Sequence, residues 1–238
     1  MIDGKRVIGI IPARAGSKGL PGKNTLQICG KPLIAWSIES GKKSKYIDVL
    51  IVSTDSEQTA RISRSFGASI PFIRPGHLAT DEATTIDVVS HALEYLELEF
   101  NQTFEYTVLL EPTSPIRRID DIDRMLDKLH NLRKNFDAII SLGEVHGHPS
   151  ILKTINSQKI ESFIKDQPKI TRRQDNTPVY FPFGVAYICK TTTLLAEKTF
   201  YPERLTHFII QRDQCVEIDD EYDFLMAEAI LSKRAKLE

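Results

Sequence analysis

A short apolar run that leads straight into a glycine-rich, basic loop is the feature of this sequence that most restricts its fold. Residues 7–11 read Val-Ile-Gly-Ile-Ile, which is typical of a strand buried on both faces of a parallel sheet, and Pro12 ends it. The following loop, residues 13–24, carries three glycines and the cations Arg14, Lys18 and Lys23. Its backbone N–H groups can surround phosphate oxygens while the cations neutralise their charge. The sequence therefore predicts a polyphosphate site at the end of a buried strand.

Further apolar runs repeat the order of strand, polar loop and helix. The expected strands are residues 49–52, 70–73, 106–110, 138–142, 185–188 and 208–210, and the main expected helices are residues 33–40, 84–98, 120–132 and 221–231, with another ending near residue 66. Thr80 and Asp81 are expected to cap helix 84–98. This rhythm predicts an α/β fold, Rossmann-like, with a mostly parallel sheet and helices on both faces. Ligands bind such sheets at the carboxyl ends of the strands, so we expect the opening loop at that edge.

Residues 143–183 interrupt this rhythm. They are richer in proline, histidine, glutamine and lysine, with short strand-like pieces at residues 151–155 and 160–164. Apolar alternation without a Gly/Ser run favours a small antiparallel excursion over a linker. We therefore expect residues 1–142 and 184–238 to form one α/β domain and residues 143–183 to leave it.

Composition and charge exclude several classes of protein. The formal net charge of -1 gives no general attraction to nucleic acid or to an anionic membrane. The sequence has no run of about 18 apolar residues to cross a bilayer and no signal-peptide core. The isolated cysteines Cys29, Cys189 and Cys215 indicate neither a disulfide framework nor a zinc site. We expect a cytoplasmic enzyme with no nucleic-acid or membrane partner.

The opening loop differs in spacing from two common nucleotide-binding loops. Five residues separate Gly16 from Gly22, and Asn24 follows Lys23, whereas a P-loop has four residues there and a Ser or Thr for Mg²⁺. The glycines also lack the G-x-G-x-x-G order of a dinucleotide site. A phosphate-loop ATPase is therefore disfavoured, and the remaining alternative is a surface loop with solvated lysines.

An acidic segment precedes the closing helix. Residues 216–223 contain five carboxylates, and acidic residues favour the first turn of any helix, so a structural role is one interpretation. Glu217 and Asp219 flank Ile218 in a strand-like stretch and are expected on the same side. Two hard oxygen ligands beside substrate phosphates suit Mg²⁺ or another divalent cation. Together with the opening loop, these two carboxylates predict a metal–nucleotide site.

Short motifs follow one another in order along nearly the whole chain. They are Pro12-Ala13-Arg14, Ser17-Lys18-Gly19, Lys23-Asn24, Gly30-Lys31-Pro32-Leu33, Val52-Ser53-Thr54-Asp55, Arg74-Pro75, Leu78-Ala79-Thr80-Asp81, Pro112-Thr113-Ser114-Pro115 with Arg117, Arg173-Gln174-Asp175 and Glu217-Ile218-Asp219. In this order the chain resembles the acylneuraminate cytidylyltransferases, or CMP-sialic acid synthetases, which activate acidic ulosonic sugars.

The resemblance implies transfer of CMP from CTP to the anomeric hydroxyl of an ulosonic acid, with release of pyrophosphate, in a homodimer joined by the 143–183 excursion. The implied nucleotide-binding residues are Ala13, Arg14, Ser17, Lys18, Lys23, Asn24 and Arg74. Lys18, Lys23 and Asp219 are the expected catalytic residues, and Glu217 and Asp219 the expected metal ligands. The expected sugar-binding residues are Glu111, Arg173, Phe183, Phe200 and Tyr201.

Four positions depart from the family pattern. Glu111 stands where many relatives have Gln, Glu217 stands where Asp is usual, and residues 181–184 read Phe-Pro-Phe-Gly in place of Arg-Pro-Asn-Gly. A carboxylate at position 111 repels an acidic sugar unless it is protonated, metal-bound or paired with a cation on the substrate. The acceptor therefore stays open, and two alternatives remain: a nucleotidyltransferase of the same fold with another base or sugar, and a catalytically idle nucleotide- or sugar-binding subunit.

Overall fold

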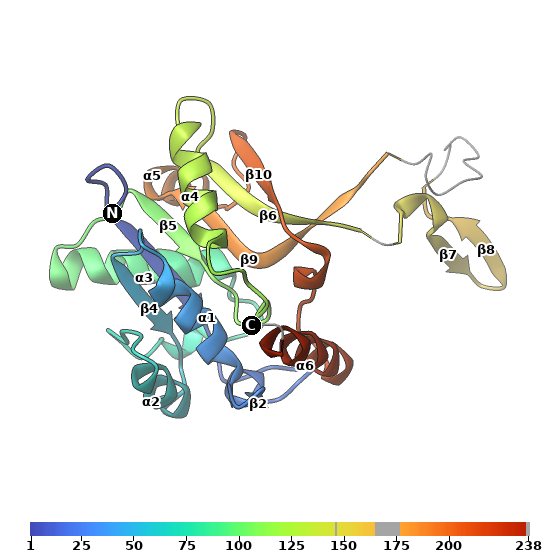
Figure 1. Ribbon diagram of the computed structural model, residues 1–238, viewed down its shortest axis with the longest axis horizontal. Coiled ribbons are helices and arrows are strands. Elements are labelled where there is room, and N and C mark those ends of the chain that lie inside the picture. Colours follow the sequence, from blue (N-terminus) through green and yellow to red (C-terminus); the bar gives the residue numbers. More distant parts are fainter. Residues whose placement is uncertain (146, 165–176, 237–238) are drawn as a thin grey trace.

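A six-stranded sheet lies at the centre of the computed structural model, which describes residues 1–145, 147–164 and 177–236 (Figure 1). Its strand order is β10-β6-β9-β5-β1-β4. The strands are β1 (Val7–Pro12), β4 (Val49–Ser53), β5 (Tyr106–Leu109), β6 (Ala138–Glu144), β9 (Tyr180–Lys190) and β10 (Leu205–Ile209). β1 runs parallel to β4 and β5, β10 runs parallel to β6, and β9 runs antiparallel to β5 and β6. The expected mostly parallel sheet is confirmed.

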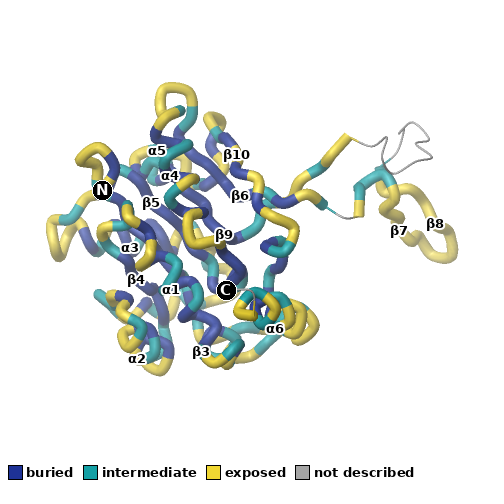
Figure 2. Tube along the Cα trace, in the orientation of Figure 1, coloured by how far each residue is buried: buried dark blue, intermediate teal, exposed yellow. Residues whose placement is uncertain are grey.

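Helices cover both faces of this sheet because the strands are apolar on both sides. The helices are α1 (Leu33–Lys43), α2 (Glu57–Ser65), α3 (Thr85–Phe100), α4 (Asp121–Asn131), α5 (Thr191–Glu197) and α6 (Glu221–Ala235). Ile11 packs in one buried cluster with Ile34 of α1 and Met125 of α4. Its neighbour Ile10 packs in a second cluster that contains residues of α3 and α5. The strands thus form the buried centre of the molecule, as Figure 2 shows.

The 3-10 turns are η1 (Lys23–Thr25), η2 (Gly76–Leu78), η3 (Pro149–Ile151) and η5 (Arg212–Gln214). In the part of the chain that the structure describes, every helix is too short or too polar to span a bilayer.

A hairpin reaches away from this body (Figure 1). Its strands β7 (Lys153–Asn156) and β8 (Lys159–Ser162) pair antiparallel, and every residue in both is exposed (Figure 2). Both lie inside the 143–183 segment, where short antiparallel strands were expected. The strands of the body overlap that segment at its two ends, since β6 continues to Glu144 and β9 begins at Tyr180.

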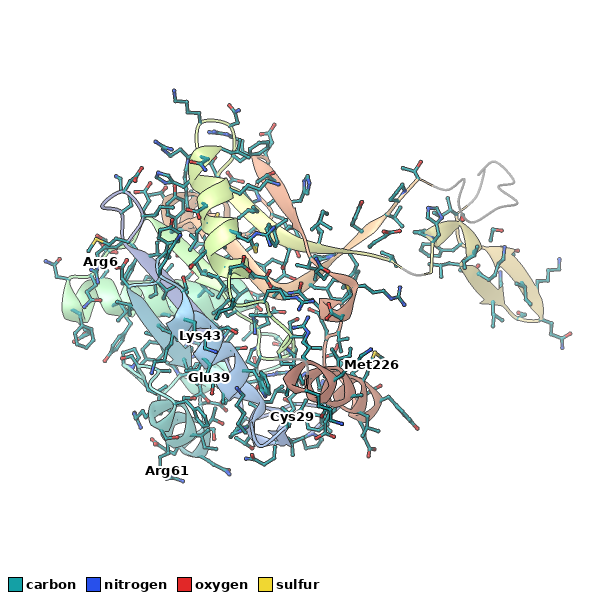
Figure 3. The ribbon with its side chains drawn as sticks, in the orientation of Figure 1. Arg6, Cys29, Glu39, Lys43, Arg61 and Met226 are labelled. Carbon is teal, nitrogen blue, oxygen red and sulfur yellow. The ribbon has the colours of Figure 1, made fainter. Side chains whose placement is uncertain are left out.

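The C-terminal helix α6 packs against a segment near the N-terminus. Small strands β2 (Gln27–Ile28) and β3 (Lys31–Pro32) turn at Cys29, whose Sγ lies 3.2 Å from Ser232 Oγ of α6. Ile28 shares a third buried cluster with Leu231 of α6. Figure 3 shows Cys29 beside α6, which also carries Met226. This packing matters for the site because the acidic segment leads directly into α6.

Three sequence-based expectations about local structure are wrong. Residues 70–73 form no strand; Ser69 makes a single bridge with Ile51, and Pro71 has no N–H to extend the ladder. Asp81 does not cap α3; Thr84 does, accepting from the N–H of Asp87 at 3.2 Å. The expectation for Thr80 fails in the same way, since the cap lies four residues later. The helix α5 and the small strands β2 and β3 were not anticipated.

Candidate active site

The opening loop and the acidic segment meet at the carboxyl end of β1. The Nζ of Lys23 donates to the backbone oxygen of Ile218 at 2.8 Å and lies 3.2 Å from Oδ1 of Asp219. A Cβ on Gly19 would lie 2.3 Å from the backbone oxygen of Asp219, so this close approach requires glycine. Ile218 itself is buried, and its N–H donates to the backbone oxygen of Thr113 at 2.8 Å. Two segments from opposite ends of the chain therefore build one site.

Asp81 holds two cations of the opening loop. Its Oδ1 accepts from Arg14 at 2.7 Å, and its Oδ2 lies 2.6 Å from the Nζ of Lys18. These two partners hold the pKa of Asp81 below its usual range. A cavity of about 270 Å³ opens here, lined by Arg14, Gly16, Ser17, Lys18, Ala79, Thr80 and Asp81. An anion entering this cavity meets oriented cations and competes with a single carboxylate for them.

Three other predicted nucleotide-binding residues, Asn24, Ala13 and Arg74, are buried and hold the opening loop in place. Asn24 is buried and donates from Nδ2 to the backbone oxygen of Arg14 at 3.1 Å. The N–H of buried Ala13 donates to the backbone oxygen of Ser53 at 2.9 Å. Arg74 is buried too, with its Nε 3.1 Å from Ser53 Oγ, and burial lowers its pKa to about 10. Their polar groups act within the protein, joining the loop to the end of β4.

Glu217 and Asp219 differ in burial. Oε1 of Glu217 accepts from the N–H of Gly184 at 2.8 Å and from Ser114 Oγ at 3.2 Å, and burial raises the pKa of Glu217. The side chain of Asp219 is 80% exposed and contacts Lys23. Glu217 Oε2 and Asp219 Oδ2 accept no hydrogen bond from the described residues. One oxygen on each carboxylate is therefore available to a ligand.

This donor set fits a divalent cation that is held jointly with substrate. Within residues 1–145, 147–164 and 177–236, no group of three or more His, Cys, Asp or Glu side chains could hold a metal by itself. Mg²⁺ is commonly bound through one or two carboxylates, with substrate phosphates and water completing its coordination. Glu217 and Asp219 match that requirement, whereas a metal that needs a full protein cage would not fit.

Arg117 ties the strand ends together beneath the site. Its guanidinium is buried and donates to the backbone oxygens of Val185 at 2.7 Å, Glu111 at 2.8 Å and Gly184 at 2.9 Å. A fourth bond reaches Ser37 Oγ of α1 at 2.8 Å. Burial lowers the pKa of Arg117 to about 10. This residue fixes the end of β5 against β9 and so positions Glu111.

A second cavity, of about 330 Å³, opens next to Glu111. It is lined by Thr84, Thr85, Ile86, Leu109, Glu111, Tyr187, Lys198, Thr199, Phe200 and Tyr201. Tyr187 lies between two other rings, with its centroid 6.2 Å from that of Phe200 and 6.1 Å from that of Tyr201. Glu111 Oε2 is so close to Gly184 that a Cβ there would lie 2.4 Å away. Because Gly184 also binds Glu217, the cavity adjoins the paired carboxylates.

The carboxyl of Glu111 is expected to make the stability of the protein depend on pH. Burial raises the pKa of Glu111 to about 7, and the charge of Glu217 adds to the shift. A raised folded-state pKa means that the stabilising contribution is complete below about pH 4 and is lost as pH rises through 7. Glu111→Gln is therefore expected to gain up to about 3 kcal/mol of unfolding free energy relative to wild type between pH 4 and pH 8. Urea titrations without divalent cations measure this.

The matched control is Glu203→Gln, which replaces an exposed carboxylate. Its stability relative to wild type is expected to change little over the same pH range. A Glu111→Gln difference that stays constant from pH 4 to pH 8 contradicts the burial of this carboxyl.

Phe183 does not lie with the other predicted sugar-binding residues that the structure describes. The Phe183 ring packs edge-on against Phe181 at 5.2 Å, and a Cβ on Gly143 would lie 2.7 Å from Phe183 Cε2. Phe183 packs against the cluster that contains α1 and α4, whereas Phe200 belongs to the cluster on the other sheet face. Arg173 lies outside the described residues. Glu111, Phe200 and Tyr201 are the three that the structure brings together.

Several residues of the site were missed from the sequence. Tyr187 stands in an apolar strand and Lys198 at a helix end, where each has an ordinary structural interpretation. Asp55 accepts from the N–H of Ala15 at 2.8 Å and so holds the opening loop. Its position directly after a strand is the signal that could have found it.

Together, the strand-end loop with its cations, the two available carboxylates and the adjoining cavity lie at the carboxyl edge of an α/β sheet, where proteins of this architecture commonly bind their ligands. The model of the family described as Cytidylyltransferase matches residues 8–237. The chain therefore belongs to the cytidylyltransferase family.

Individual relatives agree with this placement. The chain is 33% identical over 230 residues to the N-acylneuraminate cytidylyltransferase of Escherichia coli O18:K1:H7, covering 96% of this chain and 53% of the relative. It thus spans about half the length of that relative. It is 32% identical over 232 residues to the CMP-N,N'-diacetyllegionaminic acid synthase of Legionella pneumophila, covering 95% of this chain and 96% of the relative.

A solved structure shows the same fold. CMP:2-keto-3-deoxy-manno-octonic acid synthetase, complexed with CTP, superimposes with a TM-score of 0.70 at 15% identity. The match covers 96% of this chain and 99% of that one. At this level of identity the likeness concerns the fold.

Proposed function

We propose that this protein transfers CMP from CTP to the anomeric hydroxyl of an acidic ulosonic sugar and releases pyrophosphate. The observation that carries the proposal is the contact of Lys23 with Asp219, which joins a cation-rich loop to a pair of available carboxylates beside a second cavity. Membership of the cytidylyltransferase family supports the donor. The names of the two relatives, for N-acylneuraminate and N,N'-diacetyllegionaminic acid, support the class of acceptor.

In the proposed reaction the anomeric oxygen forms a bond with the α-phosphorus. The bond from that phosphorus to the oxygen bridging to the β-phosphorus breaks, pyrophosphate leaves, and the hydroxyl proton is lost to solvent. Such a transfer depends on positioning and on neutralising charge, so no covalent enzyme intermediate is needed. Lys18 and Lys23 would neutralise the phosphates, and Arg14 would orient them.

Glu217 and Asp219 would hold a divalent cation, and Mg²⁺ suits their oxygen donors. When bound, the cation supplies charge neutralisation at the phosphates and lowers the pKa of a hydroxyl that it contacts. Ser114 and Gly184 hold the Glu217 carboxylate in place through its other oxygen.

A panel of nucleotides and acceptors tests the proposal. With Mg²⁺ and an ulosonic acid, CTP is expected to give pyrophosphate at a rate well above that with UTP, GTP or ATP. A preference for UTP or GTP would favour a nucleotidyltransferase of the same fold with another base. Absence of pyrophosphate with every nucleotide and acceptor, despite nucleotide binding, would favour an idle binding subunit.

Gly19→Ala is expected to lower kcat/KM for CTP by roughly 10- to 100-fold. The added Cβ cannot occupy a point 2.3 Å from the Asp219 backbone oxygen, so the loop must move, and small displacements of positioned groups cost that much. Gly147→Ala is the control, since its Cβ meets nothing within 4 Å and the residue lines neither of the two cavities. Initial rates of pyrophosphate release measure both. Equal losses in the two variants contradict the assigned contact.

We also propose that the protein is a cytoplasmic homodimer joined through the β7–β8 hairpin. Ile155 and Ile160 pair across the hairpin and are 79% and 72% exposed, which supports burial of this surface by a second copy. Replacing both by Ser is expected to convert the dimer to a monomer in sedimentation equilibrium. A wild-type monomer, or an unchanged dimer in the double variant, contradicts this role.

The cytoplasmic location is supported by the three free thiols, which fit a reducing compartment.

A further inference from the structure

The carboxylate of Glu111 lines the second cavity without a protein partner. Its backbone is firmly held, because the backbone oxygen accepts from Arg117 at 2.8 Å, from Ser37 Oγ at 3.2 Å and from the N–H of Ser114 at 3.2 Å. Neither side-chain oxygen accepts a hydrogen bond or forms an ion pair with any described residue. A rigid strand end therefore presents a bare carboxylate to the cavity.

An unpartnered carboxylate in this position is costly. The Glu111 side chain is partly buried, and Glu217, another carboxylate, is held nearby through Gly184. A ligand group that donates hydrogen bonds and carries positive charge removes this cost, because charge-assisted hydrogen bonds are about twice as strong as neutral ones. A carbonyl oxygen in the same place adds repulsion. The chemistry of the cavity therefore favours a cation next to Glu111.

The remaining walls of the cavity fit such a group. Tyr187, Phe200 and Tyr201 supply three aromatic rings, whose faces attract cations. Lys198 also lines the cavity, with its Nζ 3.4 Å from Ser90 Oγ. A cavity with one carboxylate and one ammonium group is complementary to a ligand that carries both an acid and a base.

We propose that Glu111 selects an acceptor sugar that bears a basic nitrogen, an amine or an amidine, in addition to its carboxylate. This inference rests on the proposed function, because it treats the second cavity as the acceptor site. The N–H groups of the substituent donate to the Glu111 carboxylate, and the aromatic rings cover its carbon atoms. Glu111 therefore determines which acceptor sugar is bound.

A matched pair of ligands tests the inference: N-acetylneuraminic acid and its acetamidino analogue, in which the acyl oxygen is replaced by nitrogen. The two have nearly the same shape and differ in charge and hydrogen-bond donors. Calorimetric titration of the wild-type protein is expected to show about 10-fold or greater preference for the acetamidino compound, the effect of one charge-assisted hydrogen bond. In Glu111→Gln this preference is expected to disappear.

A second variant separates Glu111 from the rest of the cavity. Lys198→Met is expected to weaken both ligands by the same factor and to leave their ratio unchanged. Equal binding of the two compounds by the wild type, binding of neither, or a preference retained in Glu111→Gln would overturn the inference. Pyrophosphate release is measured separately: an amidine preference without pyrophosphate refutes the proposed function alone, and pyrophosphate without the preference refutes the inference alone.

Discussion

Replacing Asp219 with Asn is expected to lower kcat for CMP transfer by about 100-fold or more while the fold stays intact. The amide keeps the shape of the side chain but removes the charge that would bind a divalent cation and the partner of Lys23. Loss of one preorganised electrostatic contact at a reacting centre costs about 100- to 1000-fold in kcat. Because the side chain is 80% exposed, little stability depends on it. Pyrophosphate release at saturating CTP and Mg²⁺, with thermal unfolding alongside, measures both effects.

The neighbouring residue provides the control. Asp220 caps α6, accepting from the N–H groups of Tyr222 at 2.8 Å and Asp223 at 3.0 Å, and Asn is an equally good capping residue. Asp220→Asn is therefore expected to turn over at close to the wild-type rate. A near-wild-type rate for Asp219→Asn would remove this residue from the metal pair. Equal losses in the two variants would point to a general effect of charge.

Arg117→Met is expected to destabilise the protein by at least about 3 kcal/mol. The variant removes a buried guanidinium and the four hydrogen bonds that it donates, to Ser37 Oγ and to the backbone oxygens of Val185, Glu111 and Gly184. A hydrogen bond that involves a charged group contributes about 1.5–3 kcal/mol, so the loss of four such bonds is expected to cost at least about 3 kcal/mol even after the site relaxes. Urea denaturation followed by circular dichroism measures the change.

Arg118→Met is the matched control for Arg117. Its side chain is 42% exposed and pairs with Asp213 at the surface, and such pairs contribute about 1 kcal/mol or less. If Arg117→Met were as mild as Arg118→Met, the buried network would not hold the strand ends. If both variants were strongly destabilised, the Arg118–Asp213 surface pair would contribute more to the free energy of unfolding than expected.

Much of the fold could be predicted from the sequence because local patterns and the global arrangement agree. The run at residues 7–11 is apolar at every position except Gly9, and a strand in the middle of a sheet, covered on both faces, needs that pattern. The prediction failed at residues 70–73, where a four-residue apolar run containing Pro71 resembles a strand but cannot complete a ladder. It also missed α5, a seven-residue helix that is too short to show clear periodicity.

The site was predictable where charge and position along the chain carry the information. The cations of the opening loop and the pair Glu217 and Asp219 are visible in the sequence, although their contact joins residues 196 positions apart. The roles of Asp81 and Arg74 depend on which side chains the fold places beside them. The sequence suggested that Asp81 caps a helix and that Arg74 binds the nucleotide. In the structure Asp81 pairs with Lys18, and Arg74 is buried against Ser53.

The most direct test of the central claim follows the α-phosphorus of CTP. The protein is incubated with Mg²⁺, an ulosonic acid and CTP carrying ³²P at the α-position, and the products are separated by chromatography. The account predicts that the label moves to a CMP–sugar conjugate in a one-to-one ratio with pyrophosphate, and that Asp219→Asn nearly abolishes this transfer. Label that remains in CTP, or that is released as free CMP with no sugar conjugate formed, would contradict it.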